Sequence, residues 1–200
     1  NDHVVFDLWP YYNPDAVKQR VRDTDAAKAL LADAGFPDGI KATLNAVDFQ
    51  EIPQLAELLQ LQLADAGFDL TLNVESGATF YGTQWCVTYP CAGSAELGIV
   101  DYGHRPTPDV FLTKAYRTGG DWNSSQYSNK ELDAAILDFQ STAELEGRKA
   151  ASGKIEAISN EDVPVAVAYR YNFLAGFSKR FTGVEFSALG QTLLQKAATA

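Results

Sequence analysis

The chain has 200 residues, 46% of them hydrophobic, and its 16 basic and 26 acidic side chains give a formal net charge of -10. This apolar fraction is enough to bury a core, so a disordered chain is excluded. The negative charge repels phosphate backbones and anionic lipid heads, which argues against nucleic acid and membrane surfaces as partners. No apolar run approaches the ~18 residues that a membrane-spanning helix needs.

The first residues predict no element of their own. Four aromatic side chains lie within the first dozen positions, at Phe6, Trp9, Tyr11 and Tyr12, and no capped helix precedes them. The same stretch lacks the charged and apolar regions of a signal peptide. We therefore expect the sequence to be a piece of a longer protein.

Two similar segments follow, Ala29–Phe36 and Leu61–Phe68, and both end in the letters LADAGF. Each comes directly before a run in which apolar and polar residues alternate, at 40–47 and at 69–75. Alternation of this kind is typical of a half-buried strand. The repeat therefore predicts two successive helix–strand units in one sheet.

The residues around these segments predict where the two helices begin and end. Thr24 or Asp25 is suited to cap the first helix, and Gly35 is suited to end it. Pro53 fits the first turn of the second helix, and Gly67 fits its end. A strand, a helix and a strand in this order predict a crossover with two parallel strands, and hence an α/β fold.

Two cysteines, Cys86 and Cys91, follow a short helix predicted near 79–85. Their four-residue spacing with a proline fits no redox or zinc motif, and no second pair completes a metal site. A local disulfide, which implies an oxidising compartment, and two buried thiols both remain open.

The segment DYGHRPTP, residues 101–108, follows directly on a third predicted strand at 97–101. Ligands of open α/β sheets bind at the carboxyl ends of strands, where backbone groups are unpaired. Three helices are predicted beyond this segment: one from Pro108 to about Gly119, one opened by the capping box Ser128 to Glu131, and one at 143–159. A buried strand is predicted at 163–169, and Pro164 indicates that it lies at the start of the strand or that the strand lies at a sheet edge.

Catalysis and metal binding are both poorly supported. The chain has only His3 and His104 as histidines, and it lacks the G-x-S-x-G elbow of a serine hydrolase. His104 with Asp101 or Asp109 gives at most three metal ligands, at no recognised spacing. We therefore expect no catalytic residues, no metal and no cofactor.

A binding role needs less from the same residues. Tyr102 and Trp122 offer flat apolar faces, His104 can donate or accept a hydrogen bond, and Arg105 presents a fork that suits carboxylates. An alternative is that Arg105 simply pairs with a neighbouring aspartate and the tyrosine packs. The predicted ligand-binding residues are Asp101, Tyr102, Gly103, His104, Arg105, Trp122, Asn123 and Trp85.

Five motifs, taken in order, resemble one known family. They are residues 23–39, residues 55–68, the PDVFL of 108–112, the WNSSQYSNKELD of 122–133, and the DVPVAV of 162–167 after the helix with Arg148. Together they are similar to the C-terminal half of the extracellular solute-binding proteins of family 5, the oligopeptide- and dipeptide-binding type.

The resemblance implies a two-lobed receptor of the class II periplasmic-binding-protein type, which closes around a ligand and delivers it to the permease of an ABC importer. It implies that residues 1–20 lead from a first lobe, that 21–170 form the α/β second lobe with a mixed sheet, and that 171–200 return toward the first lobe. A monomer outside the cytoplasm, in the periplasm or at the cell surface with a lipid anchor, is expected.

One position departs from the family pattern. Counted back from PDVFL, His104 stands where peptide-binding relatives carry the aspartate that pairs with the α-amino group of the peptide. An imidazole cannot replace a carboxylate as the partner of an ammonium. The sequence thus suggests a ligand without an amino anchor here, or one that presents a carboxylate, phosphate or sugar hydroxyl to His104 and Arg105.

Two other classes compete with this interpretation. A fragment of a secreted hydrolase would carry its catalytic serine or carboxylate pair outside these residues. A lobe used as a chaperone or adhesion module would bind proteins and no small ligand.

Overall fold

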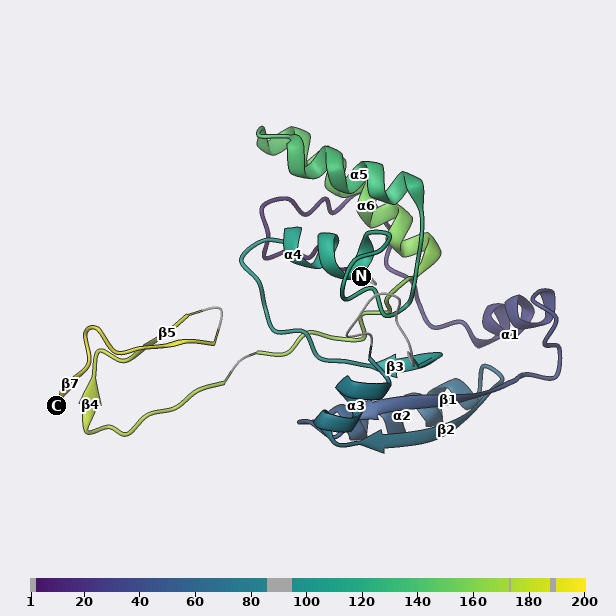
Figure 1. Ribbon diagram of the computed structural model, residues 1–200, viewed down its shortest axis with the longest axis horizontal. Coiled ribbons are helices and arrows are strands. Elements are labelled where there is room, and N and C mark those ends of the chain that lie inside the picture. The colour runs from purple at the N-terminus through teal and green to yellow at the C-terminus, as the bar shows by residue number, and fades with distance from the viewer. Residues whose placement is uncertain (1–2, 86–94, 173, 188–189) are drawn as a thin grey trace.

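The computed structural model describes residues 3–85, 95–172, 174–187 and 190–200. Two packed regions are visible in Figure 1: a parallel sheet with its helices, and a group of helices against which the N-terminal segment lies. The C-terminal segment extends away from both regions and ends in small hairpins (Figure 1). The predicted α/β fold is confirmed.

The sheet has three parallel strands in the order β2-β1-β3. Strand β1 (Ile40–Val47) is joined to β2 (Phe68–Glu75) through helix α2 (Ile52–Ala64), so the predicted crossover is present. The register pairs Ile40 with Phe68, the first residues of the two strands. Strand β3 (Leu97–Ile99) follows helix α3 (Gly77–Thr83) and pairs with the other edge of β1.

The alternation in β1 and β2 separates an apolar face from a polar one. Leu44 and Leu70 lie on one face and pack in a core with Ile52, Ala56 and Phe80 from the helices. The other face carries Asn45 and Asn73, which the register places side by side. Asn73 Nδ2 donates to Asn45 Oδ1 at 2.8 Å and Asn45 Nδ2 donates to the Leu97 carbonyl at 3.3 Å. The amide of the buried Asn45 is thus paired, as buried polar groups need to be.

Two helix caps differ by one residue from the prediction. Helix α1 (Thr24–Asp33) is capped by Asp23, whose carboxylate accepts from the Ala26 N–H at 2.9 Å. Helix α5 (Lys130–Ser141) is capped by Asn129 rather than by Ser128. In both places several capping residues stand in a row. The residue that caps is the one with extended backbone, at φ -140° for Asp23 and -146° for Asn129.

The second region is built from helices. The predicted helix after Pro108 consists of α4 (Asp109–Phe111) and a π-turn, η1 (Leu112–Tyr116), and it is followed by α5 and by α6 (Leu145–Asp162). Leu112, Leu132, Ile136, Phe139 and Ile155 form its core, and each is fully buried. From the N-terminal segment, Val5 and Trp9 pack with Phe111 beside this core.

The strand predicted at 163–169 is wrong. Val163 adopts the left-handed conformation at the end of α6, at φ 47°, and residues 164–172 run on without a ladder partner among the described residues. Pro164 has no N–H to donate to a ladder. Beyond this segment, β4 (Phe181–Thr182) pairs antiparallel with β7 (Ala198–Thr199), and β5 (Glu185–Phe186) with β6 (Thr192–Leu193).

The predicted cysteine pair, Cys86 and Cys91, lies outside the described residues. In the part of the chain that is described, no helix is both long enough and apolar enough to cross a bilayer.

Candidate ligand-binding site

The carboxyl ends of the strands carry two acidic residues that are held by tyrosines from a distant segment. Tyr171 Oη donates to Asp101 Oδ1 at 3.0 Å, just beyond β3. Tyr169 Oη donates to Glu51 Oε1 at 2.8 Å, between β1 and α2. The two tyrosine rings lie 6.5 Å apart. We call Glu51, Tyr81, Asp101, Tyr169 and Tyr171 the tyrosine–acid cluster.

Electrostatics tie the members of the tyrosine–acid cluster together. Burial, followed by the hydrogen bond to Asp101, raises the pKa of Tyr171 to about 12. Burial and the negative charge of Asp101 also raise the pKa of Tyr81. Tyr169 and Tyr171 are 44% and 45% exposed, so both rings can be reached by a ligand.

Tyr102, the neighbour of Asp101 in the chain, belongs to a group of packed aromatic rings. The Tyr102 ring stacks on Trp122, with centroids 5.9 Å apart and planes at 24°, and meets the edge of Phe111 at 5.7 Å. The guanidinium of Arg105 lies 6.0 Å from the ring centroids of both Phe111 and Trp122. Its Nη1 donates to the Gly103 and His104 carbonyls at 2.8 and 3.1 Å, which folds the segment back on itself. Burial raises the pKa of Tyr102 to about 12, so this phenol stays protonated.

His104 faces the N-terminal segment. Its ring stacks on Trp9, with centroids 6.0 Å apart and planes at 24°, and it meets Phe6 edge to face at 6.0 Å. The indole of Trp9 is 4% exposed, so it supports the imidazole from the protein interior. We call Phe6, Trp9, Tyr102, Phe111 and Trp122 the aromatic wall.

Asn123 and Trp85, the remaining two predicted residues, lie beside the aromatic wall and the tyrosine–acid cluster rather than in them. Asn123 is 4% exposed, and its Nδ2 donates to the Arg117 and Tyr127 carbonyls at 3.2 and 2.7 Å, so its amide shapes the loop behind Trp122. Trp85 packs against the core of the sheet and meets the edge of Tyr81 at 5.8 Å. Trp85 thus adjoins the tyrosine–acid cluster, while Asn123 holds the neighbouring wall in place.

Several members of the site were not predicted from the sequence. Glu51 follows a strand end in the same way as Asp101, so the same rule could have found it. Tyr169 and Tyr171 stand two positions apart, which places both rings on one side of an extended segment. Phe6 and Trp9 had no such signal, because only the fold brings the N-terminal segment to His104.

The described residues offer no catalytic arrangement. No three His, Cys, Asp or Glu side chains gather there as a metal site. Ser152, Glu156 and His3 do lie together, but the serine hydroxyl donates to the glutamate at 3.0 Å, and all three are fully buried. A nucleophile must be reached by substrate, and this fully buried serine is not.

An α/β region whose strand ends gather aromatic rings and carboxylates has the features of a small-molecule binding region. Comparison with known proteins shows the family to which the chain belongs. Residues 2–124 match the family described as bacterial extracellular solute-binding proteins, family 5, middle region. The chain belongs to this family of solute-binding proteins.

Relatives with known names agree with this assignment. The chain is 25% identical to the nickel-binding protein NikA of Staphylococcus aureus over 86% of its length, and 26% identical to heme-binding protein A of Haemophilus influenzae over 92%. The solved structure named clavulanic acid biosynthesis oligopeptide binding protein 2 superposes with a TM-score of 0.76 at 26% identity, and the match covers 99% of this chain and 36% of that one. The chain spans about a third of the length of the two curated relatives, 35% and 34%.

Proposed function

We propose that the complete protein is the extracytoplasmic solute-binding component of an ABC importer, which captures a small ligand and delivers it to the permease without chemical change. The observation that carries this proposal is that the tyrosine–acid cluster and the aromatic wall adjoin at Asp101 and Tyr102, just beyond the end of β3. Their residues come from segments far apart in sequence. A monomer with residues 21–170 as the second lobe, 1–20 leading in and 171–200 leading back fits this role.

The chemistry of the site favours a ligand with a positively charged group. Asp101 and Glu51 each use one oxygen for a tyrosine, and a carboxylate can accept further hydrogen bonds. The neighbouring tyrosine faces attract a cation through their ring quadrupoles. In this proposal the ligand's ammonium donates to the second oxygen of Asp101, beside the Tyr171 ring, and its apolar part lies on Tyr102 and Trp122.

His104 then has a supporting role. It stacks on Trp9 while Asp101, three positions earlier, supplies the carboxylate at the strand end. The histidine in place of an acid therefore does not argue against an amino-bearing ligand. Short unblocked peptides fit this description, and the names of the relatives add nickel and heme as ligands to be tested.

Isothermal titration calorimetry of the complete protein tests the proposal. The probes are an equimolar mixture of unblocked dipeptides, the same mixture N-acetylated, a nickel–histidine complex, and heme. We expect saturable binding of the unblocked dipeptides and much weaker binding of the acetylated ones, which lack the charged amine. Binding of none of these probes, or turnover of an ester or peptide substrate, would overturn it and favour the hydrolase or the protein-binding alternative.

A further inference from the structure

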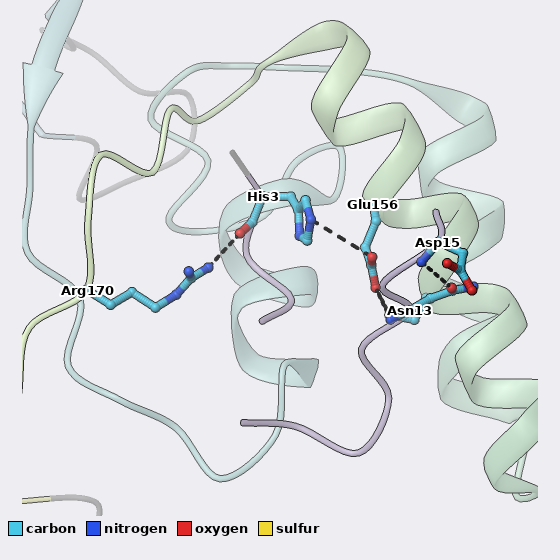
Figure 2. Close-up of polar contacts among 6 residues, drawn as sticks. His3, Asn13, Asp15, Glu156 and Arg170 are labelled. Carbon is cyan, nitrogen blue, oxygen red and sulfur yellow. Dashed lines mark hydrogen bonds and ion pairs between the residues drawn. The ribbon is translucent and has the colours of Figure 1, made fainter. Parts of the chain in front are cut away.

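A buried acid of helix α6, Glu156, contacts the N-terminal segment at two points. Glu156 is fully buried, as are His3 and Ser152. Figure 2 shows the arrangement: His3 and Asn13, at the two ends of the segment, both point to this one carboxyl group. The segment between them carries Phe6 and Trp9, which contact His104.

The two oxygens of Glu156 have different surroundings. Oε1 accepts from the Asn13 N–H at 3.1 Å and from the Ser152 hydroxyl at 3.0 Å. Oε2 lies 3.9 Å from His3 Nε2, which is too long for a hydrogen bond, and it accepts none from any described residue. A buried carboxylate oxygen without a donor is costly, whereas a protonated carboxyl group removes that charge.

The close fit of the segment is a second sign that Glu156 fixes its position. At Gly153, one turn before Glu156, an added Cβ would lie 2.7 Å from Asn13 Nδ2 and 3.5 Å from Ala16 Cβ. Helix α6 and the segment are therefore in direct contact here. A change at Glu156 that moves Asn13 moves the segment as a whole.

The charged groups on the surrounding elements contact one another. Arg170 donates to the His3 carbonyl at 2.9 Å, lies over the Phe6 ring at 4.3 Å, and interacts with the negative charge of Asp7. Arg148, two turns before Glu156 on α6, bonds to Asp109 at 3.2 Å and to Tyr11 at 3.2 Å. His3 is the titratable side chain that directly faces Glu156.

We propose that Glu156 is a positioning residue of the ligand site, which in its protonated form holds residues 3–13 on α6 and thereby holds Trp9 against His104. Burial raises the pKa of Glu156 to about 7, and the two hydrogen bonds only partly oppose this effect. Near neutral pH the group loses its proton, the buried charge weakens the attachment, and the stacking on His104 loosens. This inference rests on the proposed function, because it assigns the His104 loop to the ligand site.

Amide hydrogen exchange measured by NMR on the complete protein tests the attachment without any ligand. The protection factor of the Asn13 amide should fall about tenfold or more between pH 5.5 and pH 8, with a midpoint near 7. Cross-relaxation peaks between the Trp9 and His104 rings, which report the distance between the rings rather than their ionisation, should weaken with the same midpoint. Glu156→Gln keeps a neutral group of the same shape and should make both readouts independent of pH over this range.

Two further variants keep the test decisive. Glu161→Gln removes an exposed acid from the same helix and should follow the unmodified protein. Gly153→Ala places a methyl group against Asn13, so the amide should be weakly protected at every pH, even if Glu156→Gln folds poorly. A midpoint near 7 that persists in Glu156→Gln would overturn the proposal. Trp9–His104 cross-relaxation peaks that stay constant through the Asn13 transition would overturn it as well.

The binding profile separates this inference from the proposed function. The apparent Kd of the unblocked dipeptide mixture should rise with pH in the unmodified protein and stay level in Glu156→Gln. If the mixture binds with the same pH profile in both, Glu156 does not position the site, although the receptor function stands. If nothing binds, the proposed function fails. The exchange of the Asn13 amide and the Trp9–His104 ring contact then still test whether Glu156 positions the segment.

Discussion

Tyr171 donates its phenol hydrogen to Asp101 at 3.0 Å, although seventy positions separate the two residues in the sequence. The bond brings an extended segment from beyond α6 to the carboxyl end of β3. It orients one oxygen of the carboxylate and leaves the other for a partner. The acid at the strand end is thus prepared for a ligand by a residue far away in the chain.

Replacing this acid should reduce binding of amino-bearing ligands in particular. In Asp101→Asn we expect the affinity of the unblocked dipeptides to fall about 30-fold or more, because the ligand's ammonium loses its charged partner. The N-acetylated dipeptides should be affected much less. Calorimetry of both mixtures measures the difference.

Asp69→Asn is the matched control. Asp69 is an exposed acid on β2, 3.5 Å from Lys41, and it lies outside the tyrosine–acid cluster. This variant should bind both mixtures as the unmodified protein does. An equal loss in the two variants would point to the net charge of the lobe rather than to Asp101 as the cause.

The same bond should be visible in the titration of the tyrosine. The pKa of Tyr171 is raised to about 12, first by burial and then by Asp101, because the neutral phenol donates to the carboxylate and the phenolate is repelled by it. In Asp101→Asn the charge is gone, so the pKa of Tyr171 should fall toward its ordinary value of 10.0. Ultraviolet difference titration of Asp101→Asn against Asp101→Asn/Tyr171→Phe isolates this tyrosine, and an unchanged pKa would show that burial alone sets it.

Gly35 and Gly39 allow the cost of backbone strain to be measured separately from the cost of a steric clash, because the two glycines have nearly the same φ. Gly39 and Gly35 have φ of 91° and 94°, where any side chain is strained. A Cβ on Gly39 would also lie 2.4 Å from the Gly67 carbonyl oxygen, whereas one on Gly35 meets nothing within 4 Å. The Gly67 oxygen accepts from the Ile40 N–H at 2.9 Å, so moving it disturbs the start of β1.

Gly35→Ala should therefore lower the free energy of unfolding by about 1 kcal/mol, and Gly39→Ala by roughly 3 kcal/mol. Urea denaturation followed by far-ultraviolet circular dichroism measures both. Equal losses would mean that the chain relaxes around Gly39 and that the contact with Gly67 contributes little.

Local sequence patterns predicted some of the strands of this fold and failed for another. The alternation of β1 and β2 and the helical spacing between them encode local structure and burial, so the parallel unit could be predicted from them. The run at 163–169 is apolar, as a buried strand is, but a strand also needs a ladder partner, and no local pattern supplies one. The prediction failed there for that reason.

The residues of the site also fall into those that a local feature predicts and those that only the fold brings together. Asp101 was predicted because a strand end is a local feature with a general meaning. The bonds from Tyr171 to Asp101 and from Tyr169 to Glu51 span 70 and 118 positions, and contacts at such separations exist only after folding. The stacking of Trp9 on His104 is equally non-local, which is why His104 was assigned directly to the ligand.

The buried acid predicts an unusual dependence of stability on pH. The pKa of Glu156 is raised from its ordinary 4.5 to about 7 in the folded protein, so the folded state holds a proton that the unfolded state releases between these values. The stabilisation from the protonated group is fully present below pH 4.5 and is lost as the pH rises through about 7. Most paired carboxylates act in the opposite direction, because their folded pKa is lowered.

Glu156→Gln isolates this contribution, since it leaves the other acids unchanged. The unfolding free energy of the unmodified protein minus that of the variant should decrease by about 3 kcal/mol at most between pH 4.5 and pH 8. Urea midpoints taken at half-unit steps of pH trace the curve. The steepest change should fall between pH 5 and 7, as a group that titrates near 7 when folded and near 4.5 when unfolded requires. A difference that is flat, or that grows with pH, would mean that Glu156 is ionised in its buried position and that a protonated His3 neutralises it.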